Sequence, residues 1–368
     1  MASDLHLFLC GDVMTGRGID QILPVPSNPV LYESFVTDAR EYVELAEAAH
    51  GPVPRQVDLD YIWGDALAEM RVADLRIINL ETAITSSEDA WPGKAVHYRM
   101  NPANIACLKS ARVDCCSLAN NHCLDWGYPG LFETLDALDA AGIPHAGAGR
   151  NIAEAAAPAV LDAPGGGRVL VFAYGSPTSG VPAEWSAREA RAGVNFLEDL
   201  SNEAAAGVAE NIAQIKQSGD IVIVSIHWGD NWGYEIPTEQ TDFAHALIAG
   251  GADVVHGHSS HHVKALEVHR GRLILYGCGD FLTDYEGITG FEQFRGDLSV
   301  LYLPTLAQDG RLLDLRMIPM QMRQFRLNRA GNSDVRWLCD VLNKQSEPFG
   351  VRFDIAGEAI TLQRGSAF

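Results

Sequence analysis

Residues Ile221-Val222-Ile223-Val224-Ser225-Ile226 form an almost uninterrupted β-branched run that ends at His227. A strand that is apolar on both faces needs cover on both faces, as the central strands of parallel α/β sheets have. Helical patterns flank this strand, over residues 202–217 before it and residues 239–249 after it. The alternation predicts an α/β protein in which helices cover the sheet.

The same alternation extends along most of the chain. Further strands are predicted at residues 5–10, 75–80, 113–118, 143–145, 168–174, 254–255, 263–268 and 273–277. Further helices are predicted at residues 32–49, 59–71, 131–141 and 333–344. The polar residues that follow strand ends are Asp12, Glu81, Asn121-His122, His227, His258 and Asp280. Because residues just past the carboxyl ends of such strands meet in one crevice, we expect these side chains to form one site.

Composition limits the kinds of partner. The chain has 368 residues, of which 47% are hydrophobic and 20% charged, as in ordinary globular proteins. Its 48 acidic and 27 basic residues give a formal net charge of −21. Repulsion from such a surface disfavours nucleic acids, anionic membranes and polyanionic substrates. We expect neither nucleic acid nor membrane as a partner.

Cysteines and the N-terminus indicate the compartment. The seven cysteines form no CxxC pair, and most lie in apolar surroundings, as buried free thiols do. The residues from Met1 to His6 carry no basic segment followed by an apolar stretch, so they do not resemble a signal peptide. No run approaches the roughly 20 apolar residues that cross a bilayer. A cytoplasmic location is expected, and the oligomeric state stays open.

Histidines are concentrated in one segment. Four of the twelve histidines lie in His256-Gly257-His258-Ser259-Ser260-His261-His262, beside a glycine that lets the backbone approach a metal ion. Carboxylate, amide and imidazole donors without thiolates suit Mg, Mn, Ca, Fe or Zn. We expect a divalent ion, with Ca, Mn or Mg favoured over Zn.

Several motifs occur together in a fixed order. They are Gly11-Asp12, Asn79-Leu80-Glu81, Ala119-Asn120-Asn121-His122 continuing to Gly127, His227-Trp228-Gly229, Gly257-His258-Ser259-Ser260-His261 and Leu275-Tyr276-Gly277-Cys278-Gly279-Asp280-Phe281. This ordered set resembles the CapA family, which is named for poly-γ-glutamate capsule synthesis and is similar to calcineurin-like metallophosphoesterases. The resemblance implies a four-layer α/β/β/α sandwich with a mononuclear or dinuclear metal centre.

The resemblance also assigns residues to roles. The positions that match metal ligands are Asp12, Glu81, Asn121, His227, His258 and His261. His122 matches the histidine that acts as a proton donor. Two departures from the superfamily weaken a two-metal phosphatase centre: Asp12 is followed by Val13 and Met14 instead of an Asp-x-His motif, and Glu81 replaces an aspartate.

Three functions fit these residues. The favoured prediction is a metal-dependent peptide epimerase, because some CapA-like proteins encoded with lasso peptides invert a C-terminal residue. Its acid/base groups would be His122 and His261, oriented by Asp125 and Asp12. The alternatives are a metal-dependent hydrolase of phosphoester or peptide bonds and a non-catalytic partner in polymer or peptide synthesis. The tryptophans that are candidates for lining a peptide cleft are Trp63, Trp91, Trp126, Trp228 and Trp232.

The chain is expected to form one main domain. Residues 1–327 are predicted to be the metallophosphoesterase-like domain, with a helical insertion at about residues 24–71. Residues 328–368 are predicted to be a C-terminal extension that packs on the same domain.

Overall fold

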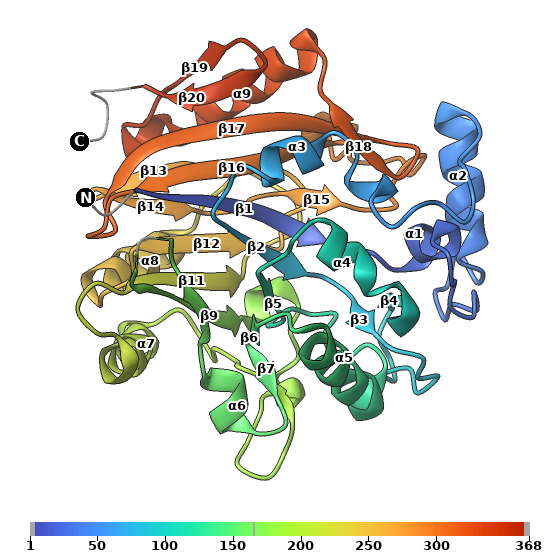
Figure 1. Cartoon of the computed structure of the whole chain (residues 1–368), viewed down its shortest axis with the longest axis horizontal. Coiled ribbons are helices and arrows are strands. Elements are labelled where there is room, and N and C mark those ends of the chain that lie inside the picture. Colours follow the sequence, from blue (N-terminus) through green and yellow to red (C-terminus); the bar gives the residue numbers. More distant parts are fainter. Residues whose placement is uncertain (1–3, 165, 364–368) are drawn as a thin grey trace.

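Two β-sheets packed face to face form the centre of the molecule, as the computed structural model shows for residues 4–164 and 166–363 (Figure 1). The larger sheet has the strand order β19-β20-β17-β16-β1-β2-β5-β6, with β15 paired to β1 and β18 to β17. Its strands are β1 Leu5–Val13, β2 Leu75–Leu80, β5 Cys115–Ser117, β6 His145–Ala146, β15 Asp280–Leu282, β16 Leu298–Leu306, β17 Leu312–Arg323, β18 Arg326–Arg329, β19 Phe353–Ala356 and β20 Ala359–Leu362. Strands β1, β2, β5 and β6 run parallel, and β16 joins β1 antiparallel.

The smaller sheet has the order β13-β14-β12-β11-β9-β8. Its strands are β8 Ala159–Asp162, β9 Arg168–Gly175, β11 Ile221–His227, β12 Val254–His258, β13 Leu266–His269 and β14 Arg272–Leu275. Strands β9, β11, β12 and β14 run parallel. Two short pairs lie outside the sheets: β3 Ala83–Ile84 with β4 Arg99–Met100, and β7 Ala148–Gly149 with β10 Gly193–Val194.

Helices cover the outer faces of both sheets (Figure 1). The α-helices are α1 Arg17–Ile22, α2 Arg40–His50, α3 Ala66–Met70, α4 Ala106–Ser110, α5 Gly127–Ala141, α6 Ile152–Ala156, α7 Asn202–Ile215, α8 Thr238–Ala249 and α9 Asn332–Ser346. The 3-10 turns are η1 Tyr61–Trp63, η2 Pro102–Asn104, η3 Pro177–Ser179, η4 Ala183–Trp185, η5 Glu292–Phe294 and η6 Glu347–Phe349. Within the described residues no helix combines the length and the apolar character that crossing a membrane requires.

Strand β11 shows why the sheets are layered. Ile221 and Ile223 belong to the large core between the sheets, whereas Val222, Val224 and Ile226 belong to the core under α7 and α8. Successive side chains of a strand point to opposite faces, so an unbroken apolar strand fills both cores. The predicted four-layer α/β/β/α sandwich is confirmed.

Two predicted helices are wrong in part. Residues 32–39 are not helical, because residues 30–38 form a loop closed by the hydrogen bond from Leu31 N to Thr37 O at 2.9 Å, and α2 begins only at Arg40. The helix predicted at 59–71 is interrupted at Gly64, which has a φ of 46° and lies against the carbonyl of Leu327. The predicted insertion at 24–71 therefore contains α2, η1 and α3 joined by loops.

The C-terminal residues continue the larger sheet. Strand β20 pairs with β17, β19 pairs with β20, and α9 packs beside them. The predicted boundary between residues 327 and 328 falls inside β18, and the division into domain and extension stays a prediction. Residues 364–368 of the predicted extension lie outside the described residues.

Candidate metal centre and active site

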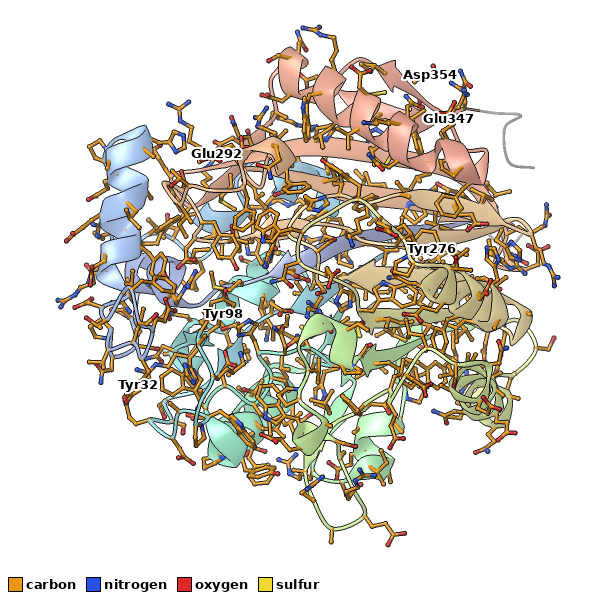
Figure 2. All side chains as sticks on the ribbon, turned by 180° about the vertical axis from the view of Figure 1, so that it is seen from behind. Tyr32, Tyr98, Tyr276, Glu292, Glu347 and Asp354 are labelled. Atoms are coloured by element: carbon orange, nitrogen blue, oxygen red, sulfur yellow. The ribbon has the colours of Figure 1, made fainter. Side chains whose placement is uncertain are left out.

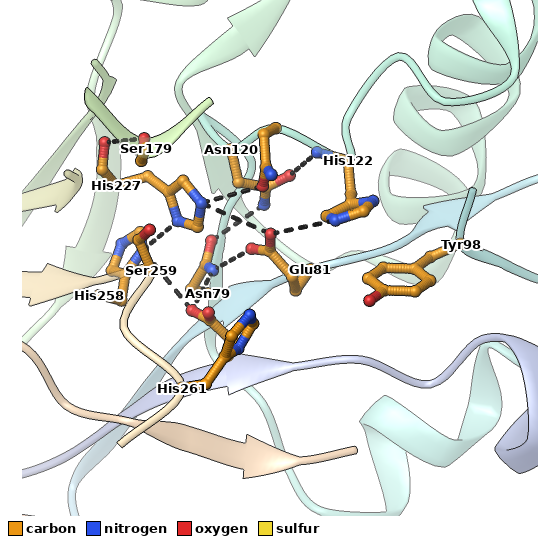
Figure 3. A network of polar contacts seen from close by, with 12 residues as sticks. Asn79, Glu81, Tyr98, Asn120, His122, Ser179, His227, His258, Ser259 and His261 are labelled. Carbon is orange, nitrogen blue, oxygen red and sulfur yellow. Dashed lines mark hydrogen bonds and ion pairs between the residues drawn. The ribbon is translucent and has the colours of Figure 1, made fainter. Parts of the chain in front are cut away.

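The carboxyl ends of strands from both sheets meet at one place (Figure 3). Asp12 and Glu81 come from β1 and from the residue after β2, in the larger sheet. His227 and His258 are the last residues of β11 and β12, in the smaller sheet. Parallel strands end on the same side of a sheet, so the loops after them share one crevice. The structure thus brings together the residues that the sequence predicted as one site.

Asp12, His227 and His258 are grouped as metal ligands would be. One donor atom from each residue lies within 4.8 Å of the others, and all three side chains are buried. His258 Nδ1 is 3.8 Å from Asp12 Oδ1 and 2.9 Å from His227 Nδ1. Glu81 and Asn121, also predicted ligands, contact this group through His227. The His227 Nε2 atom is 3.5 Å from Glu81 Oε1 and 3.0 Å from Asn121 Oδ1.

A second group shares Asp12 with the first. Asp12, His261 and Asp280 also place one donor atom each within 4.8 Å of one another. Asp280 Oδ2 is buried and has no hydrogen-bond partner among the described residues. Buried polar atoms are normally satisfied, so this oxygen is suited to an ion. Imidazole and carboxylate donors fit a divalent ion of hard or borderline character.

A polar network orients the ligands. Asn79 Nδ2 donates to Asp12 Oδ1 at 2.7 Å and to Glu81 Oε2 at 2.5 Å. Asn120 Nδ2 donates in turn to Asn79 Oδ1 at 3.0 Å. On the other sheet Ser225 Oγ lies 2.9 Å from His258 Nε2. Such outer contacts fix the direction of metal ligands.

Burial shifts the titration of the central groups. Burial, and after it the charge of Asp280, raise the pKa of the Asp12 carboxyl to about 7. Burial also raises the pKa of Glu81 well above its ordinary value, and neighbouring Asp12 adds to this. The pKa values of His227 and His258 are lowered well below the usual range, first of all by burial. Neutral imidazoles are the form that binds metal ions.

His122 forms a network with Asp125 and Lys94 at one side of the centre. Its Nδ1 is 2.6 Å from Asp125 Oδ2, and Lys94 Nζ is 2.5 Å from Asp125 Oδ1. The ring stacks on Tyr98 with centroids 3.8 Å apart, and its Nε2 lies 4.0 Å from Glu81 Oε1. Burial lowers the pKa of His122 to about 4, although Asp125 opposes this shift. The pairing of His122 with Asp125 is the one that the sequence predicted.

His261 has a different carboxylate partner from the predicted one. Its Nδ1 is 3.0 Å from Asp280 Oδ1, so Asp280, rather than Asp12, orients the ring. Burial acts to lower the pKa of His261, but the charge and hydrogen bond of Asp280 outweigh it and raise the pKa above its usual value. Asp280 follows a strand in the sequence, which was the available signal for it. Sequence patterns gave no signal for Lys94 or Tyr98.

The sequence suggested that Gly257 lets the backbone approach a metal ion, but in the structure this glycine does not open space for an ion. A Cβ at this position would lie 2.5 Å from Trp228 Nε1 and 2.5 Å from Leu275 O. The missing side chain therefore makes room for the indole and for β14.

A cavity of about 750 Å³ opens over the centre. Six predicted site residues line it: Asp12, Glu81, Asn121, His122, His227 and His261. His258 and Asp125 lie behind them. Of the five tryptophans predicted as candidates for a peptide cleft, Trp232 lines the cavity and stacks on Phe291 with ring centroids 4.1 Å apart. The cleft prediction is wrong for the three tryptophans buried in the interior, which are Trp63, Trp126 and Trp228, and Trp91 packs against Trp185.

Fold and site define an α/β/β/α sandwich with a candidate metal centre at its strand ends. The chain belongs to the family of bacterial capsule synthesis proteins PGA_cap, whose model matches residues 6–285. The resemblance to CapA proteins is thereby confirmed.

Named relatives agree with this family. A Mycobacterium tuberculosis protein described as a probable polyglutamine synthesis accessory protein is 46% identical over 350 residues, which cover 94% of this chain and 92% of that protein. The PGA biosynthesis protein CapA of Bacillus subtilis is 27% identical, over 70% of this chain and 64% of that protein. The structure of a 5'-nucleotidase precursor from Thermus thermophilus aligns with a TM-score of 0.43 and 16% identity, over 89% of this chain and 56% of that chain.

Proposed function

We propose that this chain is a metal-dependent hydrolase of amide bonds in a peptide-like polymer of the polyglutamine type. The observation that carries the proposal is that the candidate metal ligands Asp12 and His227 and the His122 imidazole line the same cavity. The name of the mycobacterial relative supplies the polymer class.

The metal would be held by Asp12, His227 and His258. A divalent ion there supplies Lewis-acid polarisation of a substrate carbonyl oxygen and of water. Asn79 holds Asp12 and Glu81 in place through its two hydrogen bonds.

His122 would carry the protons. In the tautomer whose Nδ1–H donates to the Asp125 carboxylate, Nε2 carries the lone pair, and this atom lies 4.0 Å from Glu81 Oε1. Nε2 accepts a proton from the attacking water and returns it to the leaving nitrogen, so the imidazole ends as it began. Asp125 keeps the ring in the required tautomer, and Tyr98 stacks against it.

Charge favours a neutral polymer. The carboxylates that line the cavity are Asp12, Glu81, Asp280, Glu286, Glu292 and Asp297, against the cations Arg17, Lys94 and Arg295. The net charge of −21 repels polyglutamate. Polyglutamine carries amides instead, and Trp232 and Phe291 offer apolar surface for its chain.

Epimerisation of a peptide Cα is the second candidate, because the site holds two histidine–carboxylate pairs. His122 pairs with Asp125 and His261 pairs with Asp280, and Figure 3 shows the two imidazoles at different sides of Glu81. One imidazole would remove the α-proton and the other would return a proton to the opposite face.

One experiment separates these functions. Oligoglutamine peptides are incubated with the full chain and Mn²⁺ or Zn²⁺, in D₂O and separately in H₂¹⁸O, and analysed by mass spectrometry. Hydrolysis gives shorter peptides with ¹⁸O at the new carboxyl, and His122→Gln should abolish it while metal content is retained. If the peptide instead stays intact and gains about one mass unit in D₂O, the activity is epimerisation and not hydrolysis. Binding without either change would refute catalysis and leave a non-catalytic partner in polymer synthesis.

A further inference from the structure

A second cluster of metal-ligating side chains lies away from the candidate active site. His245 of α8, Glu267 of β13 and His269 at the end of β13 place one donor atom each within 4.8 Å of the others. His245 Nε2 is 2.8 Å from Glu267 Oε1, and His269 Nδ1 is 3.5 Å from the same oxygen. None of these residues lines the cavity over the catalytic centre.

Glu267 is held in a fixed orientation. The residue is only 7% exposed, and its Oε2 accepts a hydrogen bond from the Tyr276 hydroxyl at 2.7 Å. Tyr276 is itself buried between Trp228 and Phe349. In Figure 2, Tyr276 lies apart from Tyr98, which stacks on His122 at the candidate active site. Oε1 is thereby left facing the two imidazoles, as in a ligand oriented by an outer hydrogen bond.

The spacing of the donors matches one small ion. Zinc binds imidazole nitrogen and carboxylate oxygen at about 2.0–2.2 Å, so two ligands of a tetrahedral ion lie roughly 3.4 Å apart. The separations of 2.8 and 3.5 Å from Glu267 Oε1 bracket that value. The two imidazole rings stack with their centroids 3.8 Å apart, and both side chains are partly exposed.

We propose that His245, Glu267 and His269 form a surface site for a divalent transition-metal ion of the zinc class, with the remaining coordination open to water. Two imidazoles and one carboxylate are the donor set that zinc and its neighbours prefer. The positive charge of Arg270, next to His269, disfavours the binding of a cation here, whereas the net charge of −21 of the whole chain favours it. A bound ion would tie α8 to the hairpin of β13 and β14.

Zinc content tests this site independently of catalysis. The full chain and its variants are dialysed against buffered micromolar Zn²⁺, and bound zinc is counted by elemental analysis. His245→Gln and His269→Gln should each bind one ion fewer than the unaltered chain, or bind it at least about tenfold more weakly. Cobalt should show the same loss in its visible absorption spectrum.

The matched control is His145→Gln. His145 is also partly buried, and its Nε2 lies 3.2 Å from Oδ1 of the Asp139 carboxylate. Within the described part of the chain, however, this pair belongs to no group of three side chains that could hold a metal ion. Its zinc content should be unchanged. Equal zinc content in the unaltered chain and both site variants, all folded by circular dichroism, would overturn the proposal. Binding that appears only at millimolar zinc would overturn it too.

Discussion

Asn79 is the residue on which the geometry of the candidate metal centre depends most. One amide nitrogen serves both Asp12 and Glu81, two buried carboxyl groups that would otherwise repel each other when ionised. We expect Asn79→Ala to weaken Mn²⁺ binding by about 10- to 100-fold, the usual cost of losing an outer ligand contact. Calorimetric titration measures this.

The control for Asn79 is Asn104→Ala. Asn104 is equally buried and also donates to a carboxylate, that of Asp20, but away from the centre. This variant should lose thermal stability while keeping its metal affinity. Equal loss of affinity in both variants would show that Asn79 has no specific role.

Asp20 should make stability depend on pH. Burial raises the pKa of its carboxyl, although hydrogen bonds from Asn101, Ser27 and Asn104 oppose the shift. A raised pKa means that the folded chain binds this proton more tightly than the unfolded chain does, so the contribution is complete below about pH 3.9 and is lost as pH rises through the folded pKa. In Asp20→Asn this loss should be absent. The melting temperature of Asp20→Asn relative to that of the unaltered chain should therefore rise as the pH is raised above about 3.9, and a constant difference would contradict the assignment.

At the scale of elements, strand β12 depends on close packing around Gly257. Because its Cβ would meet Trp228 Nε1 and the β14 backbone at 2.5 Å, Gly257→Ala must displace β12, which carries His258. We expect a loss of about 1–3 kcal/mol in the free energy of unfolding, with weaker metal binding. Denaturant unfolding measures the first quantity.

Gly207→Ala in α7 is the matched substitution. A Cβ there meets nothing within 4 Å, and alanine favours a helix over glycine. This variant should gain about 0.5–1 kcal/mol. A similar loss in both variants would show that crowding at β12 is not the cause.

Strands were easier to predict than the segments between them. The β-branched run that ends at His227 specified β11 and its two buried faces, because periodicity of apolar residues is a local signal. The helix predicted at 32–49 was too long, since the hydrogen bonds that close the loop over residues 30–38 are not coded by periodicity. Gly64 interrupts the next helix because of its contact with Leu327, which is remote in sequence.

The candidate site shows the same limit. Residues at strand ends were predictable, because topology alone brings strand ends together. Asp12 and His261 were both expected there, with Asp12 predicted to orient His261, but His261 contacts Asp280 instead. Lys94 lies in a loop without a motif, and only the folded chain places it 2.5 Å from Asp125.

At the scale of the whole molecule, a metal ion would connect the two sheets. Asp12 belongs to the larger sheet, and His227 and His258 belong to the smaller one. An ion that binds only the folded chain adds about 2.7 kcal/mol at a free concentration of 100 times its Kd. Saturating Mn²⁺ should therefore raise the melting temperature in scanning calorimetry, and chelation should reverse the rise. The rise should vanish in His227→Gln, which keeps the cluster of His245, Glu267 and His269; an equal rise in that variant would place the stabilising ion elsewhere.

The charge of the whole chain should also set its preference among polymers. With a net charge of −21, the chain should bind oligoglutamate more weakly than oligoglutamine of the same length at low ionic strength. Raising ionic strength from about 0.01 to 0.15 M shortens the Debye length from about 30 to 8 Å, so the difference should narrow. Fluorescence anisotropy of labelled oligomers measures both affinities.

Glu292→Gln at the cavity should strengthen oligoglutamate binding, whereas Glu203→Gln, a change at another exposed residue, on α7, should have little effect. Tighter binding of oligoglutamate at low salt would instead mean that the local cations Arg17, Lys94 and Arg295 outweigh the net charge, and it would move the proposed substrate from polyglutamine to polyglutamate.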